Sequence, residues 1–596
     1  MIIRGATVVD GTGGPPRVQD VAIVAGRIVE VGAALEGEAR EVFQAQGLIV
    51  TPGFIDVHTH YDAQLAWDAE LLPSSAHGVT TVVVGNCGVG LAPVRATDRD
   101  RLMHLLEVIE EVPVAVMSEC LAWTWESFAD YLSAMGCNEY AIDVAALLPH
   151  VALREYVMGA RGRGKSPANA EDIAAMRAIV FEAVRAGALG VSTSRSCIHM
   201  TESGPLPGTY AANEELLAIA EAIRDAGGGV FQMIPSGQSG VIEGDGGENV
   251  IAGMRPDPYR LSQEVETMRW LHRQTGVTCT FSFAMNSEIG PDYARATQAL
   301  ADAHAAGEQL YPQYSPRPLN ALSCLDAQHI FTSRPTYRAI AHLPRAERAA
   351  RMAEPAIRAA ILSESDLPLE TSDPLQMMAL TFRNNLKYVH ALPDYEPLPA
   401  TSVRQIARDT GRNPEEVYYD LLIADEGRAV LAWFADYRRG DMTEKEQTLQ
   451  NPNYLVGLGD GGAHYKLIVD ASHPTFLLAH WGRDRTRGRR FPIEMLVHRL
   501  TKLPADVAGF ADRGVVAPGM RADLNVIDFD RLGVSLPRIV ADLPAGAQRF
   551  LQDATGYVLT MVNGVPTRRN DRDTGARPGR ITRNPRASSV PGSRVG

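Results

Sequence analysis

The sequence has few cysteines and long apolar runs are missing. Six cysteines are scattered over 596 residues without a CxxC pair: Cys87, Cys120, Cys137, Cys197, Cys279 and Cys324. A chain of this length forms a core without disulfides, so we interpret them as reduced thiols. No apolar run of about 18 residues occurs, and the N-terminus has neither a basic nor a continuous apolar segment. We therefore expect a cytoplasmic protein with no membrane partner.

An excess of positive charge is also missing. The formal net charge is −14, which argues against nucleic acid as the main partner and favours solubility. A small molecule is then the expected partner, and the composition leaves a homo-oligomer open.

Short β-rich runs with glycine turns occupy both ends of the chain. Residues 6–9, 21–24, 27–31 and 48–50 have the pattern of strands, and residues 521–528 and 557–565 have the same texture, the latter with an Asn-Gly turn. We predict that residues 1–50 and 506–566 together form a small β-sandwich.

The middle of the chain alternates strand and helix patterns. Strand candidates are 80–85, 143–148, 188–192, 229–233, 278–283 and 454–458, and helix candidates include 170–186 and 213–226. This alternation predicts an α/β fold, a (β/α)8 TIM-like barrel over residues 51–505. A doubly wound sheet is the alternative, but the glycine fingerprint expected after its first strand is missing.

Two segments depart from the barrel pattern. Residues 340–450 are mostly helical and charged, which indicates an insertion before the last barrel strand. Residues 567–596 are rich in arginine, proline and glycine and nearly free of apolar residues, which predicts a disordered tail.

Two histidines directly follow the apolar segment that ends at Val57. His58 and His60 stand at i and i+2, so in a strand their side chains point to one face. At the carboxyl end of a barrel strand, such a pair is half of a metal site. Cys87 follows the strand candidate 80–85 between residues that permit tight turns, and a thiolate there is a good Zn²⁺ ligand.

The segment Pro52-Gly-Phe-Ile-Asp-Val-His-Thr-His60 resembles the first-strand motif of the amidohydrolase superfamily. Further segments resemble its N-acyl-D-amino-acid deacylase branch: 78–88, 149–154, 187–193, 513–524 and 562–565. The resemblance implies that Cys87 is a metal ligand. It also implies that Asp460, at the end of the eighth strand, ligates the metal and shuttles the proton between water and the leaving nitrogen.

The sequence departs from this branch at the fifth and sixth strands. The branch has a metal-binding histidine at the end of each, whereas here Gln232 and Met233 stand at one and Phe283 at the other. We therefore expect a single Zn²⁺ ion, or another divalent metal, rather than two. Because Met233, Phe281, Phe283 and Met285 stand where polar groups are expected, we predict a hydrophobic amide substrate.

Further polar residues follow the strand candidates. Arg195, His199, Arg317 and His464 are candidates for binding the substrate, Arg195 because an arginine beside a metal polarises a carbonyl. The leading hypothesis is a metal-dependent hydrolase of a small N-acyl or related amide. A cyclic-amide hydrolase of the same superfamily and a catalytically inactive barrel that binds a ligand are the alternatives.

Overall fold

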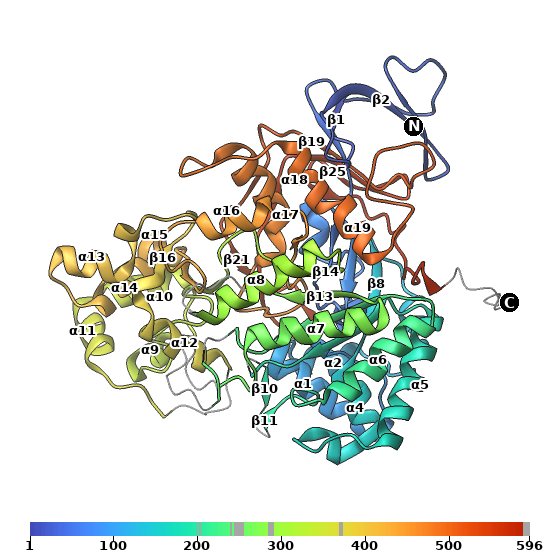
Figure 1. Ribbon diagram of the computed structural model, residues 1–596. Helices are drawn as coiled ribbons and strands as arrows, with labels where there is room; N and C mark the ends of the chain where they lie inside the picture. Colours follow the sequence, from blue (N-terminus) through green and yellow to red (C-terminus); the bar gives the residue numbers. More distant parts are fainter. Residues whose placement is uncertain are drawn as a thin grey trace.

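A curled parallel sheet surrounded by helices forms the centre of the protein (Figure 1). The computed structural model describes residues 1–197, 199–201, 204–238, 241–243, 256–283, 291–368 and 374–587. The eight strands of the sheet are β6 (Phe54–Asp56), β7 (Val79–Val84), β8 (Asp143–Pro149), β9 (Gly190–Ser194), β12 (Val230–Ile234), β13 (Thr278–Ser282), β14 (Leu310–Tyr314) and β18 (Leu455–Val456). The first and last segments meet where Thr59 bridges to Gly461, and the His60 N–H donates to the Gly461 carbonyl at 2.7 Å. The predicted (β/α)8 barrel is confirmed.

Six of these strands coincide with strand candidates of the sequence, β6 lies in the apolar segment that ends at Val57, and β14 has no candidate. Strand β14 contains Pro312, and a proline has no N–H to donate to a neighbouring strand. Its sequence therefore lacks the usual strand signal, although β14 pairs with β13 and β18.

Helices follow the strands and cover the outside of the barrel. They are α1 (Arg99–Glu110), α2 (Val114–Cys120), α3 (Phe128–Met135), α4 (His150–Met158), α5 (Ala170–Ala186), α6 (Asn213–Asp225), α7 (Leu261–Thr275), α8 (Pro291–Ala305), α17 (His473–Phe476), α18 (Ile493–Leu500) and α19 (Lys502–Ala508). The predicted helices 170–186 and 213–226 correspond to α5 and α6. Helix α5 begins where Asn169 caps it: its side chain accepts from the Asp172 N–H, and Asp172 accepts from the Asn169 N–H.

Strands from both ends of the chain form one sheet. It contains β1 (Ile2–Val8), β2 (Arg17–Val24), β3 (Arg27–Gly32), β4 (Val42–Gln44), β5 (Ile49–Pro52), β19 (Leu524–Ile527), β24 (Tyr557–Val562), β25 (Val565–Arg569) and β26 (Arg572–Asp573). N-terminal strand β5 pairs with C-terminal strand β19, so the two ends lie side by side at the top of Figure 1. Alternate residues of these strands pack into a common apolar cluster.

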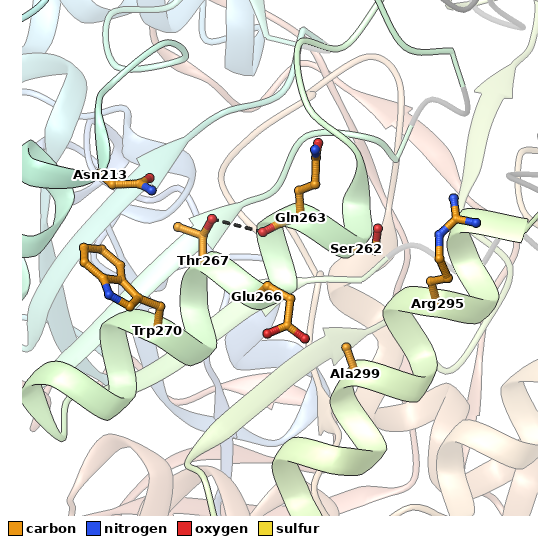
Figure 2. Close-up of a pocket in the computed structure, with 8 residues that line it drawn as sticks. All are labelled: Asn213, Ser262, Gln263, Glu266, Thr267, Trp270, Arg295 and Ala299. Atoms are coloured by element: carbon orange, nitrogen blue, oxygen red, sulfur yellow. Dashed lines mark hydrogen bonds between the residues drawn. The ribbon is translucent and has the colours of Figure 1, made fainter.

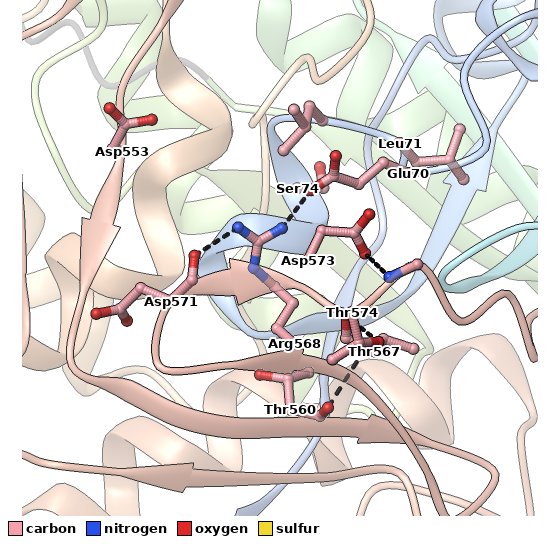
Figure 3. A network of polar contacts seen from close by, with 12 residues as sticks. Glu70, Leu71, Ser74, Asp553, Thr560, Thr567, Arg568, Asp571, Asp573 and Thr574 are labelled. Atoms are coloured by element: carbon pink, nitrogen blue, oxygen red, sulfur yellow. Dashed lines mark hydrogen bonds and ion pairs between the residues drawn. The ribbon is translucent and has the colours of Figure 1, made fainter.

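Residues 567–587 have a defined conformation that includes strand β26 and the end of β25, so the prediction of a disordered tail is wrong for them. Arg568 of β25 pairs with Glu70 and donates to the Asp571 carbonyl, as Figure 3 shows. Residues 579–587, the C-terminal arm, then cross the amino ends of the barrel strands, where Gly579 bridges to Tyr140. The arm has the low apolar content that its sequence shows, but hydrogen bonds of its backbone and polar side chains hold it against the barrel. Residues 588–596 lie outside the described part of the chain.

The segment that connects β14 to β18 in the sequence forms a separate lobe, drawn in yellow at the left of Figure 1. Its helices are α9 (Pro335–Ile340), α10 (Arg345–Ala353), α11 (Pro355–Ser363), α12 (Pro374–Asn384), α13 (Val403–Thr410), α14 (Pro414–Leu422), α15 (Ala424–Gly427) and α16 (Thr443–Gln450). A small antiparallel sheet accompanies them, in the order β15 (Asn320–Ser323), β17 (Leu431–Phe434), β16 (Val389–Ala391). The inserted segment thus begins earlier than residue 340 and is not wholly helical. In the described ranges, no helix has the length and apolar character needed to cross a membrane.

Candidate metal centre

Two imidazoles and one thiol converge at the carboxyl ends of the first two barrel strands. The Nε2 atoms of His58 and His60 lie 3.2 and 3.6 Å from the Sγ atom of Cys87. One ligand atom from each of the three residues lies within 4.8 Å of the others, and all three side chains are buried. The structure therefore brings these three predicted ligands together.

Asp460 faces the same two imidazoles. Its Oδ1 atom lies 3.4 Å from His58 Nε2 and 3.6 Å from His60 Nε2. The histidines are almost fully buried, whereas the Asp460 side chain is 21% exposed, so Asp460 lies toward solvent. The turn that carries it is tight: a side chain at Gly459 would come within 2.8 Å of both Asp56 and His473.

The other nitrogen of each imidazole faces an acceptor. His58 Nδ1 lies 2.6 Å from the side-chain oxygen of Gln313, and His60 Nδ1 lies 3.4 Å from Oε1 of Glu110. An acceptor at Nδ1 favours the tautomer that leaves Nε2 free, and this is the usual outer partner of a metal-binding histidine. Both Nε2 atoms are therefore oriented toward Cys87 and Asp460.

Neighbouring strands hold the turn that carries Cys87. The residue has a left-handed backbone with φ +58°, and a side chain at Gly85 would come within 2.2 Å of the Leu147 carbonyl. The Cys87 N–H donates to the side-chain oxygen of Gln232 at 3.1 Å, and Ser192 accepts from the Gly88 N–H at 3.0 Å. Side chains from β9 and β12 thus fix the thiol toward the histidines.

Burial and mutual charge shift the pKa values of these groups. Burial raises the pKa of Cys87 to about 12 and lowers the pKa of His58 to about 4. Burial alone would lower the pKa of His60, but the charges of Glu110 and Cys87 raise it well above its usual range. Burial also opposes the ionised form of Asp460, but its hydrogen bond with His60 and the nearby imidazoles hold its pKa well below the usual range.

His464 and His199 lie beside this cluster. His464 Nε2 is 3.6 Å from Oε2 of Glu110, and its side chain is 24% exposed. His199 Nδ1 is 3.0 Å from the hydroxyl of Ser194, the last residue of β9. Burial and then the charge of His464 lower the pKa of His199 to about 3. The structure brings both predicted residues to the carboxyl ends of the strands.

The two predicted arginines do not reach the cluster. The guanidinium of Arg195 pairs with buried Glu264 at 3.0 Å and lies over the ring of Tyr259. The guanidinium of Arg317 is fully buried and donates to Asp470 at 2.9 Å and to Ser472 at 2.6 Å. Their donors contact these side chains rather than the proposed metal ligands, and a role in binding the substrate stays a prediction.

The aromatic and thioether residues near the fifth and sixth strands also face away from the site. Strand alternation directs Gln232 and Thr280 into the barrel, so Met233, Phe281 and Phe283 point outward. Phe283 packs against Tyr293 of α8 at 5.4 Å between ring centroids. The basis for predicting a hydrophobic substrate therefore fails for these three residues, and Met285 lies outside the described residues.

Glu110 was not identified from the sequence, although a signal for it exists. Helix α1 buries Met103 and Leu106 on its apolar face, and Glu110 continues that row four residues later. A glutamate on the buried side of an amphipathic helix requires a partner. The sequence alone does not show that this partner is His60.

The outer helices hold an open pocket of about 540 Å³ between α7 and α8 (Figure 2). Its polar groups have partners nearby: Glu266 pairs with Arg269 at 2.8 Å, and the Thr267 hydroxyl donates to the Gln263 carbonyl at 3.0 Å. This pocket thus has neither a metal-ligand set nor the location at strand ends that barrel enzymes use.

Comparisons with known proteins agree with this architecture. The sequence model of a protein family described as the amidohydrolase family matches residues 41–568. The D-aminoacylase of Alcaligenes xylosoxydans xylosoxydans is 26% identical over 98% of this chain and 97% of its own length. A solved D-aminoacylase, described by its binuclear metal centre, has a TM-score of 0.62 at 24% identity and 98% and 99% coverage. An N-acyl-D-glutamate deacylase from Bordetella bronchiseptica, solved with zinc and a phosphonate inhibitor, has a TM-score of 0.60 at 23% identity and the same coverage.

Proposed function

Because the chain belongs to the amidohydrolase family, we propose that it hydrolyses the C–N amide bond of a small N-acyl compound. The reaction would use one divalent cation, with Zn²⁺ as the first candidate. His58, His60, Cys87 and Asp460 would hold the cation. The observation that carries the proposal is the orientation of the two imidazoles, whose Nδ1 atoms face acceptors while both Nε2 atoms face the thiol and the carboxylate.

The chemistry of the donor set fits such an ion. Nitrogen and sulfur ligands with one carboxylate suit Zn²⁺ better than Mg²⁺ or Ca²⁺. Burial raises the pKa of the Cys87 thiol to about 12, so the thiolate forms only where a cation compensates its charge. Asp460 and Glu110 add two carboxylates around the same imidazoles, which also favours a cation.

Among the residues that the structure describes at the ends of the fifth and sixth strands, there is no second set of metal ligands. Gln232 and Ser282 face the barrel interior near the ends of β12 and β13, and both are neutral. An amide and a hydroxyl are weak ligands beside imidazole and thiolate. This supports one ion rather than two, and a D-aminoacylase of the same fold is described as having one-metal activation.

The ion, when bound, supplies Lewis-acid polarisation of the scissile carbonyl and of the attacking water. Asp460 accepts the proton of that water at its carboxylate, since it is the most exposed of the four proposed ligands. It then passes the proton to the leaving nitrogen. Gln313 holds His58 in one orientation, and His199 and His464 contact the substrate from the rim.

Metal analysis combined with activity tests the proposal. We expect about one divalent ion per chain and turnover of an N-acyl-D-amino acid or a simple linear amide. His58→Ala/His60→Ala should lose both the ion and the activity, and the exposed His104→Ala should lose neither. A double variant with full metal content and activity contradicts the proposal.

A panel that adds cyclic amides separates the remaining alternatives. Turnover of cyclic amides alone would indicate a ring-opening hydrolase of the same family. Ligand binding without hydrolysis, unaffected by a chelator, would indicate an inactive barrel.

A further inference from the structure

Glu110 is a buried carboxylate whose charged partners, among the described residues, are imidazoles. It is the last residue of α1 and 1% exposed. Among the described residues, its ion pairs are with His60 and His464. A buried carboxylate is costly unless a positive group or hydrogen bonds compensate it. The position of Glu110 between the two imidazoles therefore calls for an explanation.

The two oxygens of Glu110 face imidazoles from different segments. Oε1 lies 3.4 Å from His60 Nδ1 after the first strand, and Oε2 lies 3.6 Å from His464 Nε2 after the eighth strand. The Glu110 carbonyl also accepts from the His464 N–H at 2.6 Å. One residue at the end of a helix thus connects the two segments that carry proposed metal ligands.

We infer that Glu110 is a positioning residue that orients His60 toward the metal and holds His464 at the rim. This inference rests on the proposed function. Because His60 Nε2 faces Cys87 and Asp460, Nδ1 is the nitrogen left for Glu110. A carboxylate at this distance favours the proton on Nδ1 through its charge, restrains the ring and makes Nε2 a stronger donor to a metal.

The two histidine ligands differ in their outer partners. His58 has a neutral partner in Gln313, whereas His60 has a charged one in Glu110. The negative charge of Glu110 therefore acts on His60 and not on His58. At the same time, Glu110 holds His464 where it contacts the substrate, so metal binding and the rim share one side chain.

Competition between the protein and a chromophoric chelator for Zn²⁺ tests the inference. We expect Glu110→Gln to weaken Zn²⁺ binding by about 10- to 100-fold, because the amide keeps the shape but loses the charge. Glu110→Asp restores the charge and should recover part of the affinity. Glu119→Gln, the same change at an exposed site, should bind Zn²⁺ like the wild type.

A second readout separates positioning from general stability. Co²⁺ in place of Zn²⁺ should give a visible spectrum that changes in Glu110→Gln and returns toward the wild type in Glu110→Asp. Equal Zn²⁺ affinity of the wild type and both variants overturns the inference and leaves the proposed function standing. Absence of Zn²⁺ binding in the wild type instead overturns the proposed function. If Glu110→Gln does not fold, the test uses Glu110→Asp, whose shorter side chain moves the carboxylate away from His60. If Glu110→Asp then has the Zn²⁺ affinity and the Co²⁺ spectrum of the wild type, the inference is overturned.

Discussion

The two ends of the barrel strands hold buried charge in different ways. At the amino ends, Asp143 at the start of β8 pairs with Arg513 at 2.8 Å and with Arg521 at 3.0 Å. Arg521 also pairs with Asp523, so carboxylates and guanidinium groups alternate. At the carboxyl ends, in contrast, the described ion pairs of Asp460 and Glu110 are with histidines alone.

This difference distinguishes the amino ends of the strands, which have a structural role, from the carboxyl ends, which carry the candidate metal centre. A buried charge that is fully paired keeps elements together and does not need a ligand. Carboxylates whose charged partners are imidazoles are compensated only in part, and burial raises the pKa values of Glu110 and Asp56 to about 7. Clusters of shifted pKa values at strand ends are typical of functional sites.

The largest expected effect comes from the carboxyl ends. Asp460→Asn removes the proposed proton acceptor while keeping the shape of the side chain. We expect kcat to fall by about a hundred- to ten-thousand-fold, the usual contribution of general acid–base catalysis. Steady-state kinetics on the best amide of the panel measures it, with the melting temperature as the check on folding. Unchanged kcat would mean that Asp460 does not move the proton.

The matching change at the amino ends should affect stability instead. Asp143→Ala removes a buried carboxylate that Arg513 and Arg521 share and leaves Asp523 as their other buried partner. We expect the free energy of unfolding to fall by about 3–5 kcal/mol, as for other broken buried pairs. Chemical denaturation measures this loss, and kcat of the folded variant should stay near the wild-type value. A large loss of kcat without a loss of stability would break the distinction between the two ends.

Sequence reasoning found the parts of the site that depend on local rules. His58 and His60 are two residues apart in an extended segment, and Cys87 and Asp460 follow strands, so topology brings their side chains to one end of the barrel. The direction of a side chain after a tight turn is not local. Arg195 turns to Glu264, which is 69 residues away in sequence.

The missed features depend on contacts between distant segments. Glu110 enters the site because the end of α1 meets the loop after the eighth strand, as the hydrogen bond from His464 N–H to its carbonyl reports. The C-terminal arm has a polar composition, yet Gly579 fits against Tyr140 of the barrel. Composition predicts whether a segment can form its own core, and it does not report docking on another one.

A smaller effect concerns pH at the amino ends. His77 lies just before β7; it donates to the Gln552 carbonyl and accepts from the Thr475 hydroxyl. Burial lowers its pKa to about 4, so the folded protein keeps it neutral while the unfolded chain takes up a proton below about pH 6.5. Stability is therefore lost as the pH falls from 6.5 toward 4.

Between pH 7 and pH 5 this amounts to about 2 kcal/mol. His77→Gln keeps a donor at the same place but does not titrate, so its stability should change less between the two pH values. Denaturation at pH 7 and pH 5 compares them. Parallel losses in the variant and the wild type would show that His77 is not the titrating group.

The smallest effect is expected from the C-terminal arm, which belongs to the same amino ends. The side chain of Asn584 donates to the carbonyls of Ala188 and Gly228, just before β9 and β12. Asn584→Ala leaves both acceptors without this donor, and we expect a loss of about 1 kcal/mol in the free energy of unfolding. Arg580→Ala is the control in the same arm, since its exposed side chain is removed while its backbone N–H still donates to Asp143. If both variants lose stability equally, the arm is held by its backbone alone; a loss confined to Asn584→Ala, with kcat unchanged, assigns the arm to the scaffold.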